Sequence, residues 1–310
     1  MATIDLTTPG PVAEGTLEGL PRRLALTRPE LEFLAESAGG APLPFAPEDP
    51  TPSAAANAFE SRLGQSRGAA EDQSYVEALA TLHDPAEGLE KRGLLVDGTA
   101  DAGVVGALGL LATPAVALDL DVNISGIRAR AWHRQRGGAV ATLATTDGVV
   151  FELAWFEAPH WPAELGRVAG LPDDHVLTDS TVPAAIDLPY ELLDAGGEAV
   201  RSGRADLLGT IVAHHAGDVR DAAGDAVPDA TVSSVISSLV TETQGRLRGL
   251  VADIDAGGDV VGVVSWVLLA DGWHVLRSHQ VDGANRVEVR RVDATELAAT
   301  LGPILAEVSA

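Results

Sequence analysis

The sequence predicts an α+β fold made of two pseudo-repeated halves, each with helices, a four-stranded antiparallel meander and a closing helix. Three observations predict this class. The spacing of apolar residues changes from the helical period of about 3.6 to the strand period of 2, and it does so twice along the chain. Asp-Gly and Gly-Gly pairs separate the alternating segments, as they do in β-hairpins. The two patterns start about 130 residues apart, far beyond a solenoid period, so duplication and convergence are both open explanations.

The N-terminal half is expected to begin after a tail without periodicity, residues 1–21, that holds prolines and glycines. Residues 23–26 are expected to form a strand. The next four residues, Thr27 to Glu30, have the form of a capping box that starts a helix. A long connection over residues 41–74 follows, because its run of five prolines in eleven positions cannot continue a helix or a central strand.

The rest of the first half alternates between helical and strand patterns. A helix is predicted by the spacing of Tyr75, Val76, Leu79 and Leu82, a second begins at Asp84 and Pro85 and ends at Gly93, and a third covers Val104 to Leu111. The four strands of the first meander are expected near residues 116–122, 127–134, 139–145 and 149–155, followed by a short helix near 160–169.

The second half repeats this plan. A Pro- and Asp-rich connection over residues 172–188 precedes helices near 189–203, 204–216 and 229–243 and strands near 245–254, 259–269, 273–280 and 286–292. Asp293 to Glu296 resembles a capping box for the last helix, which Gly302-Pro303 should kink or split. We therefore expect a first half over residues 22–171 and a second half over 172–310, joined in one compact body.

The composition excludes several classes of function. The chain has 310 residues and no Cys, which excludes Cys nucleophiles, Cys-ligated zinc and thiol redox chemistry. Its 45 acidic and 21 basic residues give a formal net charge of −24. Nucleic acids and anionic membranes require concentrated basic charge, so neither is an expected partner. No signal peptide and no apolar stretch long enough to span a bilayer are apparent, which predicts a soluble cytoplasmic protein.

The strongest candidate for a catalytic or metal site is His214-His215 with Asp218. This cluster would suit a hydrolase or a metal-dependent enzyme. Neighbouring residues of a helix point to different sides, so the two histidines cannot easily hold one metal ion. Asp218 lies four residues after His214 and could pair with it. The histidines could instead cap the carbonyls at a helix C-terminus, and no cofactor or metal site is predicted.

Several short segments at element boundaries share a resemblance. They are Leu26 to Leu34, Arg92 to Leu95 before Asp97-Gly98, Pro114 to Val122, Val182 to Ala184, Gly245 to Leu247 and the capped final helix. Over residues 23–308 these segments resemble the EspG family, which are cytosolic chaperones of actinobacterial type VII (ESX) secretion. The resemblance implies a mixed α/β body with pseudo-twofold halves, no cofactor and no enzymatic activity.

The resemblance also implies a partner. In mycobacteria, members of the EspG family bind the exposed helical tip of PE–PPE heterodimers, keep it soluble and direct it to one secretion system. The expected partners here are therefore PE–PPE-like or other helical ESX substrates. The turn at residues 124–126 is short, whereas many members carry a longer loop there that is implicated in cargo contact. Cargo identity and the secretion system therefore stay open.

Two regions are predicted to bind cargo. The resemblance indicates the first meander, with candidate residues Asn123, Ile124, Ser125, Ile127, Arg128, Arg130 and Trp132. The second region is inferred from a serine-rich helix, on which Val232, Ile236 and Leu239 form a thin apolar stripe. That stripe could instead pack on the second sheet, as most apolar helix faces do. Besides the chaperone and enzyme hypotheses, self-association through the meanders is a third, although charged residues on the strands would discourage edge pairing.

Overall fold

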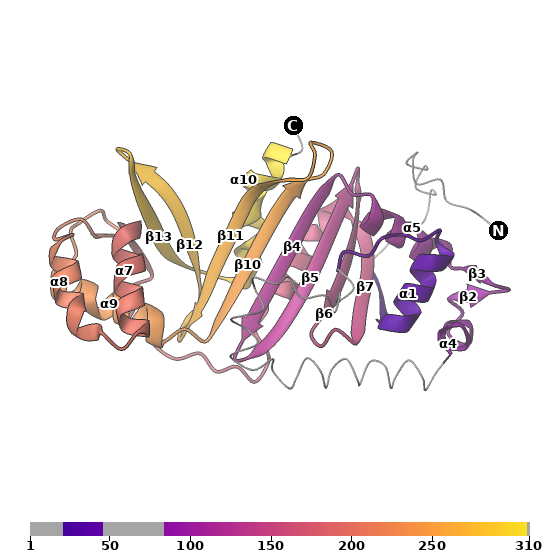
Figure 1. Ribbon diagram of the computed structural model, residues 1–310, viewed down its shortest axis with the longest axis horizontal. Helices are drawn as coiled ribbons and strands as arrows, with labels where there is room; N and C mark the ends of the chain where they lie inside the picture. Colours follow the sequence, from indigo (N-terminus) through magenta and orange to yellow (C-terminus); the bar gives the residue numbers. More distant parts are fainter. Residues whose placement is uncertain (1–20, 46–83, 309–310) are drawn as a thin grey trace, which may run out of the picture. The chain divides into compact units, whose positions relative to one another are not determined.

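The computed structural model describes residues 21–45 and 84–308, which fold into two compact units (Figure 1). The described part of the N-terminal unit is residues 21–45, 84–119, 129–161 and 252–259; that of the C-terminal unit is 120–128, 162–251 and 260–308. The expected tail, most of the connection over residues 41–74 and the helix predicted from Tyr75, Val76, Leu79 and Leu82 lie outside the described residues.

Helices and an antiparallel sheet make this an α+β fold, as the sequence predicts. The eleven strands of the sheet are β1 (Arg22–Thr27), β4 (Val116–Ile124), β5 (Ile127–Arg136), β6 (Ala139–Thr145), β7 (Val150–Glu157), β8 (Ala185–Pro189), β9 (Arg220–Asp221), β10 (Gly245–Asp253), β11 (Asp259–Leu269), β12 (Gly272–Val281) and β13 (Ala284–Val292). The order is β1-β7-β6-β5-β4 in the first half of the sequence and β10-β11-β12-β13-β8-β9 in the second. Both predicted meanders, β4 to β7 and β10 to β13, are therefore present.

The helices that follow β1 begin at local caps. In α1 (Arg28–Ser37), Glu30 N donates to Thr27 Oγ1 at 3.4 Å and Thr27 N donates to Glu30 Oε2 at 2.9 Å, which confirms the predicted capping box. Asp84 accepts a hydrogen bond from Ala86 N at the start of α4 (Pro85–Lys91). Asp101 caps α5 (Ala102–Ala112) in the same way. A small hairpin of β2 (Leu95–Val96) and β3 (Thr99–Ala100) lies between α4 and α5 in sequence.

The core of the N-terminal unit lies between these helices and the strands β5, β6 and β7. Its strand side is rich in aromatic rings, because Trp132, Phe151 and Trp155 are all buried. Phe45 stacks on Phe151 with ring centroids 4.8 Å apart and lies 5.9 Å from Trp132. Aromatic rings therefore fill the space under the helices, where each large side chain removes much apolar surface from water.

The C-terminal unit has three helices that pack on one another, α7 (Tyr190–Arg201), α8 (Leu208–Ala213) and α9 (Asp229–Thr241). Figure 1 shows them grouped beside β12 and β13. They cover the face of the strands that carries Val267, Leu269, Val287 and Val289, and these side chains form the core of the unit. No helix among the described residues is long and apolar enough to cross a membrane.

Two further helices belong largely to the C-terminal unit, α6 (Trp161–Val168) and α10 (Leu297–Val308). Asp293 and Glu296 form the predicted capping box before α10. The helix lies against β11 at Gly262, where a Cβ atom would collide with the Ile304 side chain. The glycine therefore allows the helix and the strand to come close.

The structure corrects two expectations. The connection over residues 172–188 is not irregular throughout, because β8 pairs antiparallel with β13, with Ile186 opposite Val289. Only five residues long and flanked by prolines, β8 shows little strand pattern in sequence, and its pairing depends on burial of Ile186 and Leu188. Of the kink or split expected at Gly302-Pro303, the split does not occur, since α10 is one helix. Pro303 and Ala299, whose carbonyl loses its helical partner, are exposed, so water can replace that bond.

Candidate functional site

The β4–β5 hairpin holds the first set of predicted cargo residues. Ser125 and Gly126 have φ angles of +51° and +86°, so they form a tight turn that requires left-handed backbone. Residues Asn123, Ser125, Ile127, Arg128 and Arg130 are exposed, and Ile127 is 63% exposed despite its apolar side chain. The tip thus presents one large apolar residue beside arginines.

Two other residues proposed for this region are buried. Ile124 packs below the turn, and Trp132 is only 7% exposed and belongs to the core of the N-terminal unit. Along β5 the side chain of Arg130 is still exposed, whereas from Ala131 to Arg134 the side chains on both faces of the strand are buried. Trp132 therefore lies on the same strand as Arg128 and Arg130, but it is buried whereas they are exposed.

The second predicted region, the stripe on α9, is also buried. Val232 and Ile236 lie in the core of the C-terminal unit with Val267 and Leu269 of β11. This is the alternative in which the stripe packs on the second sheet. Leu239, at the end of α9, is buried as well, but it lines one side of a cavity.

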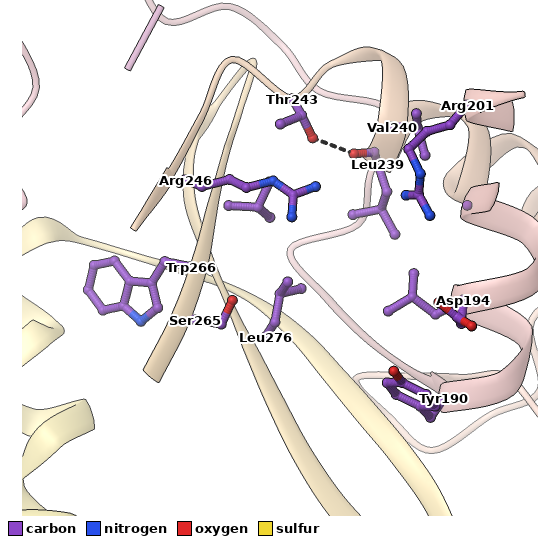
Figure 2. Close-up of a pocket in the computed structure, with 13 residues that line it drawn as sticks. Tyr190, Asp194, Arg201, Leu239, Val240, Thr243, Arg246, Ser265, Trp266 and Leu276 are labelled. Carbon is purple, nitrogen blue, oxygen red and sulfur yellow. Dashed lines mark hydrogen bonds between the residues drawn. The ribbon is translucent and has the colours of Figure 1, made fainter. Parts of the chain in front are cut away.

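A cavity that the sequence does not predict lies in the C-terminal unit. It has a volume of about 340 Å³ and lies between α7, the end of α9 and the strands β10, β11 and β12 (Figure 2). Its apolar walls come from Leu193, Leu239, Val240, Val267 and Leu276. The hydrogen bond from Thr243 Oγ1 to Leu239 O, 2.6 Å long, holds the last turn of α9 at its rim.

Two adjacent glycines of α7 set the shape of this wall. At Gly196 a Cβ atom would lie 2.9 Å from Ile236 Cγ2, so only glycine lets α7 approach α9 this closely. At Gly197 a Cβ atom would lie 3.2 Å from Arg201 Nη1, so its absence leaves room for the Arg201 side chain to lie along the helix. The same guanidinium forms an ion pair with Glu198 at 3.2 Å.

Beyond the cavity, the face of the sheet is open. Alternate residues of a strand share a face, so Val261, Val263 and Ser265 continue the face that Val267 turns toward the helices. Val261 is 38% exposed and Val263 is 53% exposed, although both are apolar. The helices α7 to α9 therefore cover only part of this face.

The strand β10 adds arginines to the open face. Arg246 lines the cavity, and Arg248 is two residues further along the same face; both are exposed. Ser125 N donates to Gln244 O at 2.8 Å, and a Cβ at Gly245 would lie 3.2 Å from Ile124 Cα. These contacts put the end of β4 beside the start of β10, with Asn123 across from Arg246. The exposed tip of β4 and the cavity thus belong to one surface of the C-terminal unit.

The charged side chains on this surface differ in whether they have an ion-pair partner. Arg128 forms a bidentate ion pair with Asp121, and this hydrogen bond raises the pKa of the guanidinium above its already high ordinary value. Within the described part of the chain, Arg246, Arg248 and Asp194 have no ion pair or side-chain hydrogen bond. An acidic chain thus carries two unpaired arginines on an exposed, partly apolar face.

The arrangement of His214, His215 and Asp218 does not support the enzyme hypothesis. His214 is the C-cap of α8, and it is His215, not His214, whose Nδ1 approaches Asp218 Oδ2, at 4.0 Å. The expected pairing of His214 with Asp218 is therefore wrong, because the chain turns after Ala213 and brings His215 to the carboxylate instead. Over residues 21–45 and 84–308, no group of three His, Cys, Asp or Glu side chains lies close enough to hold a metal ion.

Comparison with solved structures finds similar folds, among them a secretion chaperone. The structure of the Mycobacterium tuberculosis type VII secretion system chaperone EspG5, solved in complex with the PE25–PPE41 dimer, superposes with a TM-score of 0.59. The match covers 92% of this chain and 96% of that chain, at 10% sequence identity. This chain shares the fold of EspG5. HtdX from the same organism reaches a TM-score of only 0.13, which supports no inference about this chain.

Comparison of the sequence with known proteins finds no match. No family model matches the chain, and no curated protein matches it. At 10% identity the likeness to EspG5 lies in the order of helices and strands, which depends on apolar spacing and turn residues more than on particular side chains. The cavity was missed because its residues lie far apart in sequence; Arg246 and Arg248, two arginines close together in an acidic chain, are a sequence signal that points toward it.

Proposed function

We propose that this chain is a cytosolic chaperone of the EspG type that binds helical cargo of a type VII secretion system, keeps it soluble and directs it to the secretion machinery. The observation that carries the proposal is the shared fold with EspG5 over nearly the whole of both chains. EspG5 was solved bound to a PE25–PPE41 dimer. A PE–PPE-like dimer, or another helical substrate of such a system, is the corresponding partner for this chain.

The open face of the C-terminal unit suits such a partner. A helix that lays its apolar side against a groove needs an apolar floor and a polar rim. Val261 and Val263 supply an exposed apolar strip, the cavity beside α7 and α9 offers a place for a side chain, and the arginines of β10 supply polar contacts. We include the exposed residues Asn123, Ser125, Ile127 and Arg128 in the cargo site, because they form the β4–β5 tip on the same unit and the end of β4 lies beside β10.

Two buried sets support this surface from within. Val232 and Ile236 hold α9 on the sheet, and Gly196 sets the distance between α7 and α9. Their contribution to cargo binding would be to shape the groove, since a buried side chain cannot contact a partner directly. The function needs no catalytic group and no cofactor.

The proposal is tested by co-expression. The full chain is produced with each helical secreted protein, or pair of proteins, that the same genome encodes next to type VII secretion components. We expect at least one substrate that is insoluble alone to be recovered soluble and in a stoichiometric complex on size-exclusion chromatography. Variant Val263→Glu, which puts a charge on the exposed apolar strip, should reduce recovery of that complex.

A matched control changes an exposed apolar residue elsewhere, Val281→Glu at the end of β12, where Val281 is 46% exposed. It should leave recovery of the complex unchanged. A genome without any type VII component, or substrates that remain insoluble with the chain present, would contradict the proposed function.

A further inference from the structure

The two ends of the cavity carry opposite charges. In Figure 2 the guanidinium groups of Arg201 and Arg246 approach the space from α7 and β10, while Asp194 and Tyr190 lie at its other end on α7. Apolar side chains, among them Leu239 and Leu276, line the space between them. The cavity is therefore bipolar, with an apolar middle.

The charge at each end is available to a ligand. Arg246 and Asp194 make no ion pair or side-chain hydrogen bond within the described ranges, and Arg201 shares its charge only with the exposed Glu198. Arginine presents a planar set of donors that matches a carboxylate in bidentate geometry. Arg246 and Arg201 are both exposed, so water and salt screen such a pair, and it selects the ligand more than it adds affinity.

The net charge of the whole chain makes the arginine end selective. A protein with a net charge of −24 repels acidic ligands over most of its surface. An acidic side chain is then accepted only where arginines concentrate, and Arg246, Arg248 and Arg201 concentrate around this cavity and the adjacent strand. Complementary charge of this kind contributes to specificity and association rate more than to total affinity.

We propose that the cavity receives an apolar side chain from the tip of a helical pair, with an acidic residue next to it that pairs with Arg246 and Arg201. The proposal rests on the proposed function, because it takes the partner to be a helical protein. The partner that the chain selects then has an aliphatic or aromatic residue beside Asp or Glu, and no acidic residue at the Asp194 end of the cavity.

A display library of designed helical hairpins tests this pattern without a known cargo. The turn and the last helical turn on each side are randomised, and the library is selected on the full chain at low ionic strength. We expect the selected hairpins to be enriched in Asp or Glu directly beside a large apolar residue. Their binding should weaken as salt is raised, because exposed ion pairs are screened.

A charge swap then assigns the contact. Arg246→Glu should weaken the selected hairpin by at least about tenfold, and a hairpin with its acidic residue changed to Arg should regain binding to that variant, as a double-mutant cycle requires. Arg220→Glu on β9 introduces the same charge change at an exposed position of the same unit and serves as the control. Circular dichroism and melting temperature verify that each variant is folded.

The outcomes separate the two proposals. Selected hairpins without an acidic preference, or a swap that restores nothing, overturn the charge pattern while the chaperone function stands. A library that yields no hairpin at all contradicts the chaperone function itself. A small molecule that native mass spectrometry finds on the wild type and not on Ser265→Trp, which fills the cavity, overturns the proposal in favour of a small-ligand site.

Discussion

The β5–β6 hairpin of the N-terminal unit and the β11–β12 hairpin of the C-terminal unit occupy the same place in the two halves of the sequence. Arg136 pairs with Ala139 across the first turn, and Leu269 pairs with Gly272 across the second. Four residues before these turn-closing pairs stand Trp132 and Ser265. The same position therefore carries a large aromatic ring in one hairpin and a small hydroxyl in the other.

The surroundings of the two positions differ accordingly. Trp132 pairs with Leu143 across its hairpin and lies 5.9 Å from the Phe45 ring, and the space under the helices is filled. Ser265 leaves open the cavity of about 340 Å³ that Leu276 lines from the neighbouring strand. One hairpin thus contributes a closed core, which favours stability, and the other contributes an open wall, which favours binding.

The largest expected effect is on stability in the closed hairpin. Trp132→Ala should lower the free energy of unfolding by about 3–5 kcal/mol, because it removes a buried aromatic ring and leaves a cavity. Urea unfolding followed by fluorescence and circular dichroism measures this loss. A loss below about 0.5 kcal/mol, the range of ordinary surface changes, would instead put Trp132 on an accessible surface, where it could contact cargo directly.

The next effect concerns the spacing of α7 and α9, which has no equivalent in the closed hairpin. Gly196→Leu should destabilise the chain by about 1–3 kcal/mol, because the new side chain must displace Ile236. Gly209→Leu in α8 is the control, since nothing lies within 4 Å of a Cβ at that position. Equal melting temperatures for the two variants would show that α7 and α9 do not depend on this contact.

Filling the open hairpin should affect binding instead of stability. Ser265→Trp imitates the closed hairpin, and we expect cargo affinity to fall by roughly tenfold or more, a loss of about 1.4 kcal/mol of binding free energy for each factor of ten. Ser278→Trp adds the same ring at an exposed position of β12 that does not line the cavity. Isothermal titration with a soluble helical hairpin selected on the wild-type chain compares the two, and wild-type affinity of Ser265→Trp would exclude the cavity from the binding site.

A smaller effect is expected at the hairpin tip. The double variant Arg128→Glu with Arg130→Glu should weaken cargo pulldown and leave the melting temperature near that of the wild type, because exposed ion pairs such as that of Arg128 with Asp121 add little stability. The double variant Arg220→Glu with Arg277→Glu reverses one unpaired and one paired arginine elsewhere. Undiminished pulldown with the first variant would remove this tip from the cargo site.

The smallest effect depends on pH and concerns the loop that meets the end of α9. Partial burial alone would raise the pKa of Glu242, but hydrogen bonds from Ser180 and Thr181 outweigh it and hold the pKa below its ordinary value. A lowered pKa in the folded state stabilises the fold above the unfolded-state pKa, and this contribution is lost as the pH falls through the folded value.

Glu242→Gln should therefore be less stable than the wild type at pH 7, and the difference should shrink below about pH 4.3, the ordinary pKa of Glu. Urea unfolding of both proteins at pH 7 and at lower pH measures it. A difference that is constant over this range would mean that the carboxylate charge plays no part, and that the loop is held by hydrogen bonds that Gln also makes.

Local features were largely predictable because their causes are local. The capping boxes at Thr27 and Asp293, the cap at Asp84 and the turns before β7 and β12 follow from residues within four positions of one another. The strand β8 was not predictable in this way, because Ile186 and Leu188 become a strand only when β13 is beside them. Trp132 shows the same limit: its alternation with Arg130 predicts a shared face, whereas burial depends on Phe45 and the helices above it.

The class of fold, the order of helices and two meanders, and the absence of any Cys-dependent chemistry could be predicted from the sequence alone. These depend on periodicity, turn residues and composition, which are properties of neighbouring residues. Three other features became known from the packing of the folded chain: the stripe of α9 is core, His215 is the histidine near Asp218, and Arg201, Arg246 and Ser265 surround one cavity. Burial and open space depend on how distant segments pack, and the identity of a residue does not specify what will cover it.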